Sequence, residues 1–379
     1  MQFLKQWLSI GLVVGSIGPL LLATEARSQD WWADAGQARS QLERAIQDLG
    51  AFKEIEQCLG PTETARKRAA IATLIAALKD TNPDIRVNAA SALGRVKGET
   101  QTAVSALLAA LRDNHPDVRW SAGSALRRLS PEAQSLTPAL IDLLQDPQPG
   151  TRAIVTQVLV GIDADAEIVA PALISALNDE EPEVRRYVAQ SLGSLETEAQ
   201  TVIPVLIAAL GKDEDPTVRG AAIASLGRFG TDTKAVMPAL IDALDDPDTF
   251  VRWTAIRILG GIEAEANRVV PALIGALQDE DANIRGLAAT VLGSLGAKAQ
   301  AAVPALIAAL EDAVSVSGAA AHALDFIVKD LAETATTAEQ LSATKKIARS
   351  VQQALPETGL EEIKRRLAHT LDAIADRSK

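Results

Sequence analysis

The sequence is poor in the residues that most often carry redox or metal chemistry. Among 379 residues there are one cysteine, three histidines and one tyrosine. A single cysteine, Cys58, excludes a disulfide framework, a Cys-x-x-Cys redox pair and a thiolate metal cluster within one chain, and we expect it to be a buried apolar residue. Aromatic residues make up only 3% of the chain, which disfavours a β-sandwich.

Motifs for phosphate binding and hydrolysis are also missing. Residues 29–379 contain no GxxxxGK[ST], no GxGxxG after a predicted strand, no HExxH and no GxSxG, so the common nucleotide-binding and hydrolase geometries have no basis here. His115, His322 and His369 are far apart in the sequence, and we expect them to be surface or turn residues. The sequence therefore predicts no catalytic residue, no metal site and no cofactor.

What the chain does contain is acidic charge and small aliphatic residues. Lys and Arg number 37 against 49 Asp and Glu, which gives a formal net charge of −12. This balance excludes a protein that coats nucleic-acid phosphates. Hydrophobic residues make up 47% of the chain, and because so few are aromatic, Ala, Leu, Val and Ile must supply the core, as is typical of closely packed helices.

The N-terminus has the pattern of a secretory signal. Lys5 precedes an uncharged apolar stretch over residues 7–22, and Ala26 and Ser28 suit the positions before a cleavage site. We predict a signal peptide at residues 1–28 and an exported protein, periplasmic or extracellular, or in the thylakoid lumen if the source is a cyanobacterium. The alternative is an uncleaved membrane anchor, because the apolar run approaches the length of a span, although three glycines and a proline interrupt it.

A period of 33 residues runs through most of the chain. A phrase similar to Leu-Ile-x-Ala-Leu ends at Leu78, Leu111, Leu144, Leu177, Leu210, Leu244, Leu277 and Leu310. All intervals are 33 residues except one of 34, so we predict eight repeats over residues 65–328. A fixed period of this size indicates stacked structural repeats that share one core.

Each repeat is predicted to contain two helices. The first half reads Val-x-Pro-Ala-Leu-Ile-x-Ala-Leu, and its proline predicts a helix start, because its fixed φ suits the first turn. These prolines are Pro138, Pro171, Pro204, Pro238, Pro271 and Pro304. The second half reads Pro-Asp-Val-Arg-x-x-Ala-x-x-Ala-Leu-Gly, clearest at residues 83–96 and 182–195. Its apolar residues recur at spacings of three and four, which places them on one helical face.

A second register links an aspartate in each turn to an arginine six residues later. The pairs are Asp80 and Arg86, Asp113 and Arg119, Asp146 and Arg152, Asp179 and Arg185, Asp213 and Arg219, Asp246 and Arg252, and Asp279 and Arg285. With these phrases the sequence resembles the HEAT-repeat family, specifically its phycobilin-lyase-like subclass, over about 70% of the chain. The resemblance implies an all-α, right-handed α-solenoid of stacked two-helix HEAT-like repeats with helical caps. It also implies that these aspartates and arginines form a structural ladder that joins each repeat to its neighbour.

The ends of the array are expected to depart from the repeat. The last repeat keeps Asp312 but has Gly318 where the arginine is expected and Asp325 where the glycine is expected, as suits a terminal unit. We predict C-terminal capping helices in residues 329–379, at 338–355 and 360–376. Residues 29–64 are predicted to form an N-terminal linker and capping helix. The pair Trp31 and Trp32 ahead of that helix has two open roles, packing on the first repeat or meeting a membrane surface.

One stripe of each second helix is predicted to be free for a partner. Positions one and five residues after the arginine point away from the buried face, and the HEAT resemblance implies that this face lines the concave side. The first column holds Val87, Trp120, Ala153, Arg186, Gly220, Trp253 and Gly286, and the second holds Ser91, Ser124, Gln157, Gln190, Ala224, Arg257 and Thr290.

Five residues of this stripe and its border are predicted to bind a partner. Trp120 and Trp253 are interpreted as packing anchors, Arg186 and Arg257 as charge partners, and Arg128 as bordering the same surface. The alternative is that the tryptophans only cover the small residues beside them.

These patterns favour a non-catalytic, exported scaffold that binds a protein, or another extended anionic partner, through its concave face. Nucleic acid is not expected as a partner. The lyase-like resemblance leaves a bilin-lyase-like or other accessory enzyme activity as an alternative, although those lyases act in the cytoplasm, which an export signal disfavours. A membrane-surface organiser is the third hypothesis, and it requires that the N-terminal segment is retained.

Overall fold

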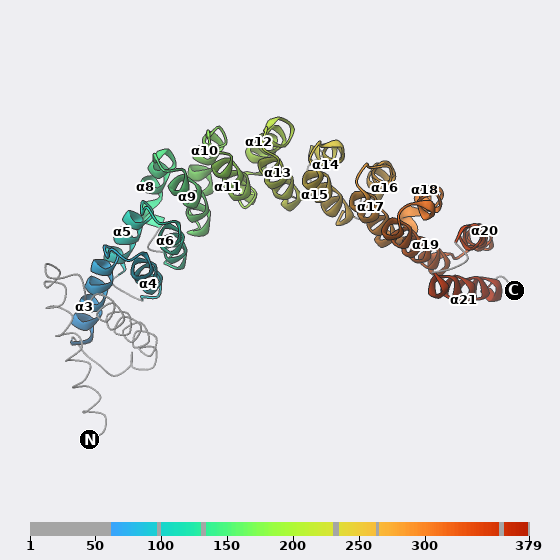
Figure 1. Ribbon diagram of the computed structural model, residues 1–379, viewed down its shortest axis with the longest axis horizontal. Helices are drawn as coiled ribbons and strands as arrows, with labels where there is room; N and C mark the ends of the chain where they lie inside the picture. The colour runs from blue at the N-terminus through green and yellow to red at the C-terminus, as the bar shows by residue number, and fades with distance from the viewer. Residues whose placement is uncertain are drawn as a thin grey trace, which may run out of the picture. The chain divides into compact units, whose positions relative to one another are not determined.

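The computed structural model describes residues 62–96, 100–129, 134–229, 235–262, 265–355 and 360–377, and the regular secondary structure of these residues is entirely helical. The predicted two-helix repeat is confirmed across these residues, and the fold is an α-solenoid (Figure 1). The predicted signal peptide at 1–28 and residues 29–61, with Trp31, Trp32 and Cys58, lie outside the described residues.

Each repeat pairs a first helix, here termed the A helix, with a second, the B helix, which carries the ladder arginine in all repeats but the last. The A helices are α3 (Thr62–Ala77), α5 (Gln101–Ala110), α8 (Thr137–Asp142), α10 (Ala166–Ala176), α12 (Ala199–Lys212), α14 (Val236–Asp242), α16 (Ala266–Ala276) and α18 (Val303–Ala308). The B helices are α4 (Pro83–Leu93), α6 (Pro116–Arg128), α9 (Pro149–Gly161), α11 (Pro182–Leu192), α13 (Pro216–Arg228), α15 (Thr249–Gly260), α17 (Ala282–Ser294) and α19 (Val314–Thr334). Two further helices follow, α20 (Ala338–Ala354) and α21 (Glu361–Arg377).

Short 3₁₀ helices occur at the ends of several A helices. They are η2 (Gln134–Leu136), η3 (Leu143–Gln145), η4 (Glu196–Glu198), η5 (Ala243–Asp245), η7 (Gly296–Ala302) and η8 (Ala309–Glu311). Such tight turns shorten the path between successive helices.

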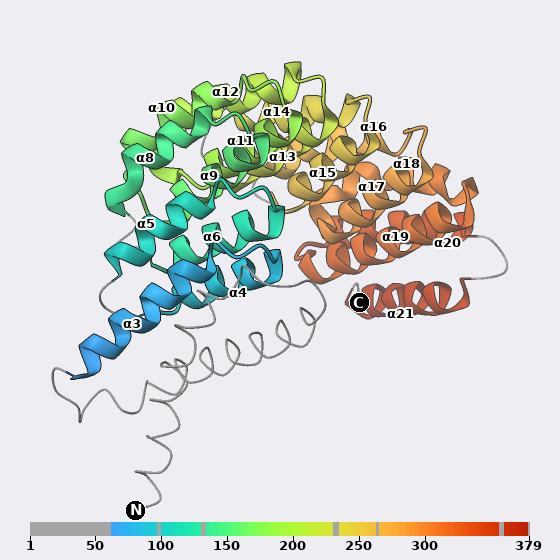
Figure 2. The ribbon, with the colours of Figure 1, turned by 60° about the vertical axis from the view of Figure 1, so that its left-hand side comes forward.

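The chain divides into two compact units, Met1–Leu136 and Thr137–Lys379. The first contains the pairs α3/α4 and α5/α6, and the second contains the six pairs from α8/α9 to α18/α19 together with α20 and α21. Within the second unit, successive B helices pack against one another far more extensively than successive A helices do. The B helices therefore form the inner, concave layer of this unit, as Figure 2 shows for α11, α13, α15 and α17.

The core of each unit lies between its A and B layers. In the B helix α11, Val184, Val188 and Leu192 are fully buried, as are Leu173 of α10 and Leu206 of α12. Burying one such side chain contributes about 1.5–3 kcal/mol. Because these residues come from successive repeats, each repeat depends on its neighbours for its core.

A glycine eight residues after the ladder arginine lets successive B helices approach closely. A Cβ added at Gly193 would lie 2.4 Å from the Cβ of Ser225, and one added at Gly293 would lie 2.8 Å from the Cα of Ala323. Any side chain at these positions would collide with the next B helix, so glycine is required here by packing.

The last repeat has a different register from the one predicted. In earlier repeats the residue that faces the preceding glycine stands six positions after the arginine, as Ser225 does relative to Arg219. Ala323 takes this place against Gly293. The arginine position is therefore occupied by Ser317 and not by Gly318, whereas Asp325 stands at the glycine position as expected.

The proline of the A helix does not always mark the helix start, so this prediction is wrong for three repeats. Helices α10, α12 and α16 each begin five residues before their proline, whereas in α8, α14 and α18 the proline lies within the first three residues. A proline inside a helix leaves a carbonyl without its donor. Pro171 in α10 and Pro204 in α12 are exposed, so water can satisfy that carbonyl.

The C-terminal helices α20 and α21 correspond to the predicted ranges 338–355 and 360–376. A capping box of Thr337 and Gln340 begins α20. Asp325 of α19 is buried at the end of the array and pairs with Arg366 of α21, whose guanidinium also lies 5.7 Å from the ring centre of Phe326. Burial raises the pKa of Asp325 although the charge of Arg366 favours ionisation. None of the described helices is both long and apolar enough to cross a membrane.

Candidate partner-binding face

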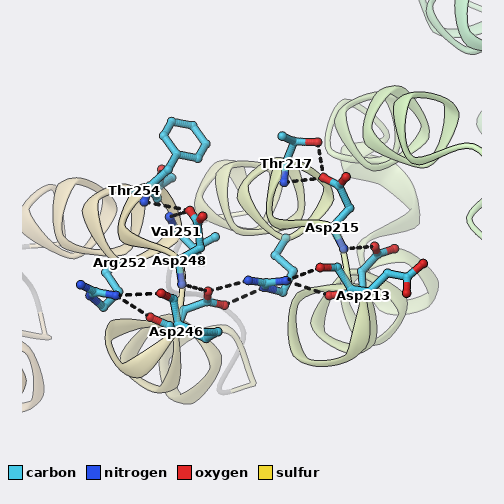
Figure 3. Close-up of polar contacts among 12 residues, drawn as sticks. Asp213, Asp215, Thr217, Asp246, Asp248, Val251, Arg252 and Thr254 are labelled. Carbon is cyan, nitrogen blue, oxygen red and sulfur yellow. Dashed lines mark hydrogen bonds and ion pairs between the residues drawn. The ribbon is translucent and has the colours of Figure 1, made fainter.

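Each inter-helical turn is organised by its aspartate. Asp246 accepts a hydrogen bond from the backbone N–H of Asp248 at 2.8 Å. Asp248 in turn caps α15 by accepting from the backbone N–H groups of Phe250 and Val251, at 2.9 and 3.3 Å (Figure 3). Such side-chain bonds satisfy the free N–H groups at a helix start, so the aspartate fixes both the turn and the direction of the B helix.

The ladder arginine connects its own turn to the turn of the next repeat. Arg252 donates from Nε and Nη2 to both carboxylate oxygens of Asp279, at 2.8 and 3.0 Å. Its Nη1 donates to the carbonyls of Asp246 and Pro247, at 2.9 and 3.2 Å. The planar guanidinium suits this bidentate arrangement, and one side chain thus satisfies acceptors in two repeats.

The same contacts recur along both units. Bidentate pairs join Arg86 to Asp113 in the first unit, and Arg152 to Asp179, Arg185 to Asp213, Arg219 to Asp246 and Arg285 to Asp312 in the second. Asp80 and Arg119 belong to the same scheme, because Arg86 donates to the carbonyl of Asp80 and Arg119 to the carbonyl of Asp113. Arg86, Arg152, Arg185, Arg219, Arg252 and Arg285 therefore each bond the carboxylate of the next repeat and only the backbone of their own aspartate.

The side chains of the bidentate pairs are largely buried, and each charge is bonded to the opposite charge. The side chains of Arg252 and Asp279 are 6% and 9% exposed. Burial alone would raise the pKa of Asp179, but hydrogen bonds from Arg152 and from the backbone N–H of Glu181 hold it below its ordinary value. A buried pair of this kind loses much stability when one partner is removed. The bidentate pairs therefore join successive repeats, and in each of them the two charges are bonded to one another.

The first five B helices of the second unit carry almost no negative charge. Helices α9, α11, α13, α15 and α17 contain a single carboxylate, Glu183, at the start of α11. Besides the five ladder arginines they carry Arg186, Arg228 and Arg257. In a chain of net charge −12, these five helices therefore carry a net positive charge outside the ladder.

An aromatic cluster lies on α15. The rings of Phe250 and Trp253 stack with centres 6.3 Å apart and planes inclined by 16°, and the Arg257 guanidinium lies 4.7 Å from the Trp253 ring centre. Phe250 is 55% exposed and covers Gly220 of α13, where an added Cβ would lie 2.7 Å from its ring. Trp253 is half-buried between its two neighbours, so the cluster presents one apolar surface edged by a cation.

Two further arginines are held on neighbouring helices. The Arg186 guanidinium lies 4.1 Å from the ring centre of Tyr187 and 3.9 Å from the exposed carboxylate of Glu183. Arg228 at the end of α13 donates to the hydroxyl of Ser194 at 3.0 Å. The predicted residues Arg186, Trp253 and Arg257 therefore lie in one layer of the second unit, on α11 and α15.

Trp120 and Arg128 belong to α6 of the first unit. Trp120 is 59% exposed, and Arg128 is exposed in the last turn of the helix next to Arg127, which contacts the hydroxyl of Ser124 at 3.4 Å. Each unit thus presents an exposed aromatic residue and arginines on a B helix.

The predicted stripe is less uniformly exposed than the helix geometry suggested. Ala153, Gly220 and Ser124 are buried. Gly220 is buried because Phe250 of the next B helix covers it. Phe250 and Tyr187 were not predicted as site residues. The spacing of Phe250, Trp253 and Arg257, three and then four residues apart, could have indicated their common face.

We also searched the described residues for metal-binding groups and cavities. Among the described residues no three His, Cys, Asp or Glu side chains are grouped to hold a metal ion. A cavity of about 390 Å³ lies beside Arg285 and Asp312, but these two charges already bond each other.

The fold and ladder define an α-solenoid repeat protein, and the family comparison agrees. A family model for HEAT repeats matches residues 43–127, 170–237 and 237–325. These matches cover more than half of the chain, and the protein belongs to the HEAT-repeat family. The phycobilin-lyase-like subclass stays a prediction. No curated protein sequence matches the chain.

Solved structures of HEAT-type solenoids share the fold. Kap121p bound to Nup53p is 16% identical with a TM-score of 0.53, over 85% of this chain and 38% of that one. The Kap95:Nup1 complex is 16% identical with a TM-score of 0.53, over 83% and 48%. Importin beta is 14% identical with a TM-score of 0.52, over 93% and 54%. This chain thus spans from about 38% to 54% of those structures, and the likeness concerns the fold alone.

Proposed function

We propose that the protein is a non-catalytic scaffold that binds a segment of a protein partner through its B-helix face. The proposal includes export, with residues 1–28 removed. The observation that carries it is the aromatic and arginine surface on the B helices of each unit, with exposed Trp120 on α6 and, on α15, exposed Phe250 and Arg257 beside half-buried Trp253. Tryptophan and arginine are enriched among residues that dominate binding energies.

The shared fold supports protein binding as the class of function. Two similar solenoids are described as complexes with Nup53p and Nup1. A fold does not by itself supply a function, so the assignment depends on the surface. Most large apolar side chains of the described repeats are buried, and few are exposed as Trp120 is.

Replacing Trp120 and Trp253 together by alanine is expected to weaken partner binding by about 30-fold, the effect of losing about 2 kcal/mol of contact. Proteins from the exported fraction would be captured on the immobilised mature chain, and the affinity of the captured partner would then be measured with purified components. Because both side chains lie on the B-layer surface, the double variant is expected to keep the helical circular dichroism of the unchanged protein.

Ile168→Ala is the matched control. Ile168 is 55% exposed on α10, an A helix, so its loss removes exposed apolar surface from the opposite layer. The control is expected to bind as the unchanged protein does. Equal affinities for the double variant and the control, with both folded, would refute the B face as the binding surface.

A further inference from the structure

We propose that Arg186, Arg228 and Arg257 form a receptor strip for an extended acidic peptide, with Phe250 and Trp253 taking up an apolar side chain of that peptide. The proposal rests on the proposed function and specifies the chemistry of the partner segment. It concerns α11, α13 and α15, three successive B helices of the second unit.

Each of the three arginine side chains is held in place by a neighbouring side chain, and none of them pairs with a buried carboxylate in the described part of the chain. Arg257 is exposed, lies on the face of Trp253 and forms no ion pair with another of the described residues. Arg228 bonds a neutral hydroxyl. Arg186 lies on Tyr187 and pairs with the exposed carboxylate of Glu183 at 3.9 Å. Stacking or bonding one edge of a guanidinium limits its rotamers and leaves other N–H groups to bind a carboxylate bidentately.

This state contrasts with that of the ladder arginines. Arg185 and Arg219 stand on the same helices, and each is committed to two carboxylate oxygens and to carbonyls of its own turn. The two sets of arginines therefore have separate roles. The ladder arginines join successive repeats. The strip arginines present positive charge on α11, α13 and α15, whose one carboxylate is Glu183.

Charge complementarity selects an acidic occupant. A basic peptide would meet mainly cations on this face, with Glu183 as the one carboxylate of α11, α13 and α15, and like charges placed together cost binding free energy. The acidic turns at the edges of the layer, such as residues 213–215 and 279–281, would repel a wide polyanion that extends beyond the B helices. A single extended chain fits between these edges, because it contacts the helices without reaching the turns.

The repeat geometry also sets the spacing of the peptide's acids. Adjacent helices pack about 8–10 Å apart, and three residues of extended chain span about 10 Å. The arginines are also offset along the helix axes, because Arg228 stands eight positions later in its repeat than Arg186, which adds about 12 Å at about 1.5 Å per residue. Acidic residues about three to five positions apart would therefore meet successive arginines. The stacked Phe250 and Trp253 offer an apolar contact next to Arg257, which favours an apolar residue adjacent to one of the acids.

The test uses a fluorescein-labelled 12-residue peptide whose glutamates are spaced three to five positions apart, with one leucine beside the central glutamate. Its binding to the mature chain would be followed by fluorescence anisotropy at low and at physiological salt. We expect saturable binding that weakens with salt, and no binding of the same peptide with lysine in place of glutamate. The substitutions Arg257→Lys, Arg257→Gln and Arg257→Glu are expected to weaken binding progressively, the last by tenfold or more.

Arg268→Glu makes the same charge change on α16 of the A layer, where Arg268 is exposed, and is expected to bind the peptide as the unchanged protein does. Two results overturn the proposal: no saturable binding of the glutamate peptide, or equal weakening by Arg257→Glu and Arg268→Glu. Tighter, Arg257-dependent binding of a single-stranded oligonucleotide of equal charge would also overturn it. Each of these leaves the proposed function standing if partner capture still depends on Trp120 and Trp253.

Discussion

Replacing Arg152 by alanine is expected to lower the free energy of unfolding by about 3–5 kcal/mol at neutral pH, the range for breaking a buried ion pair. The side chains of Arg152 and Asp179 are 9% and 8% exposed, and their contact measures 2.6 Å. The substitution leaves the Asp179 carboxylate without its guanidinium and removes the donor to the carbonyl of Asp146. Urea unfolding followed by circular dichroism measures the loss.

The loss is expected to depend on pH. In the folded protein the pKa of Asp179 is lowered, because the hydrogen bonds it accepts outweigh the effect of burial. The contribution of this pair is therefore present above the unfolded-state value of about 4 and is lost as the pH falls through the lowered pKa. Without Arg152, burial would raise the pKa of Asp179, and protonation of this carboxyl in acid would remove the unpaired charge and reduce the destabilisation. The two proteins should thus differ most at neutral pH and converge below about pH 4.

Arg268→Ala is the control for this experiment. Arg268 pairs with Glu265 at 3.8 Å, and both side chains are about two-fifths exposed. A surface pair of this kind contributes about 0–1 kcal/mol, so the control should unfold close to the unchanged protein at every pH. If Arg152→Ala lowered the free energy of unfolding no more than this control does, the ladder pair would not stabilise the contact between repeats.

Alanine substitutions at two glycines of the same helix are expected to have opposite effects. A Cβ at Gly293 of α17 would lie 2.8 Å from the Cα of Ala323, whereas one at Gly286 would meet nothing within 4 Å. Gly293→Ala should destabilise the protein by about 1–3 kcal/mol, because backbone of α19 must move. Gly286→Ala should stabilise it by about 0.5–1 kcal/mol through helix propensity alone.

Thermal unfolding of the two variants in parallel measures this difference. Both changes add one methyl group to one B helix, so composition and charge are matched. Midpoints shifted in opposite directions would establish that the close approach of B helices depends on the glycine. Stabilisation by both substitutions would mean that α17 and α19 do not pack as closely as the structure shows.

The repeat architecture was predictable because several local signals coincide with the period. Five B helices, α4, α6, α9, α11 and α13, begin with a proline. The turn aspartate precedes that proline by three residues in each of them. The A helices were predicted less well. The six prolines are all exposed, whether they lie inside a helix, as Pro171 and Pro204 do, or near its start, so the proline alone does not set where an A helix begins.

The partners of the ladder could be predicted only in part. The offset of six residues suggested a link between Asp246 and Arg252, and the structure shows that this link uses the backbone carbonyl of Asp246. The carboxylate contact goes to Asp279, 27 residues further along. That choice is set by how one repeat stacks on the next. The same dependence on stacking explains why Ser317 and not Gly318 takes the arginine position in the last repeat.

The candidate site shows the same limit. Helix geometry places Trp120 and Arg257 on an exposed face, and both are exposed. It could not show that Phe250 would extend over Gly220 of the preceding B helix, or that Arg228 would reach Ser194. Contacts between neighbouring helices depend on the distance between them, and a single helical projection does not contain that distance.

The central claim is that the B layer holds the partner, and site-specific photo-crosslinking tests it most directly. A benzophenone side chain would replace Ala224, which is exposed on α13 of the B layer, or Asn267, which is exposed on α16 of the A layer. After irradiation with the captured partner, we predict a crosslinked product from position 224 and none from position 267. Crosslinking from position 267 alone, or equally from both, would contradict the account.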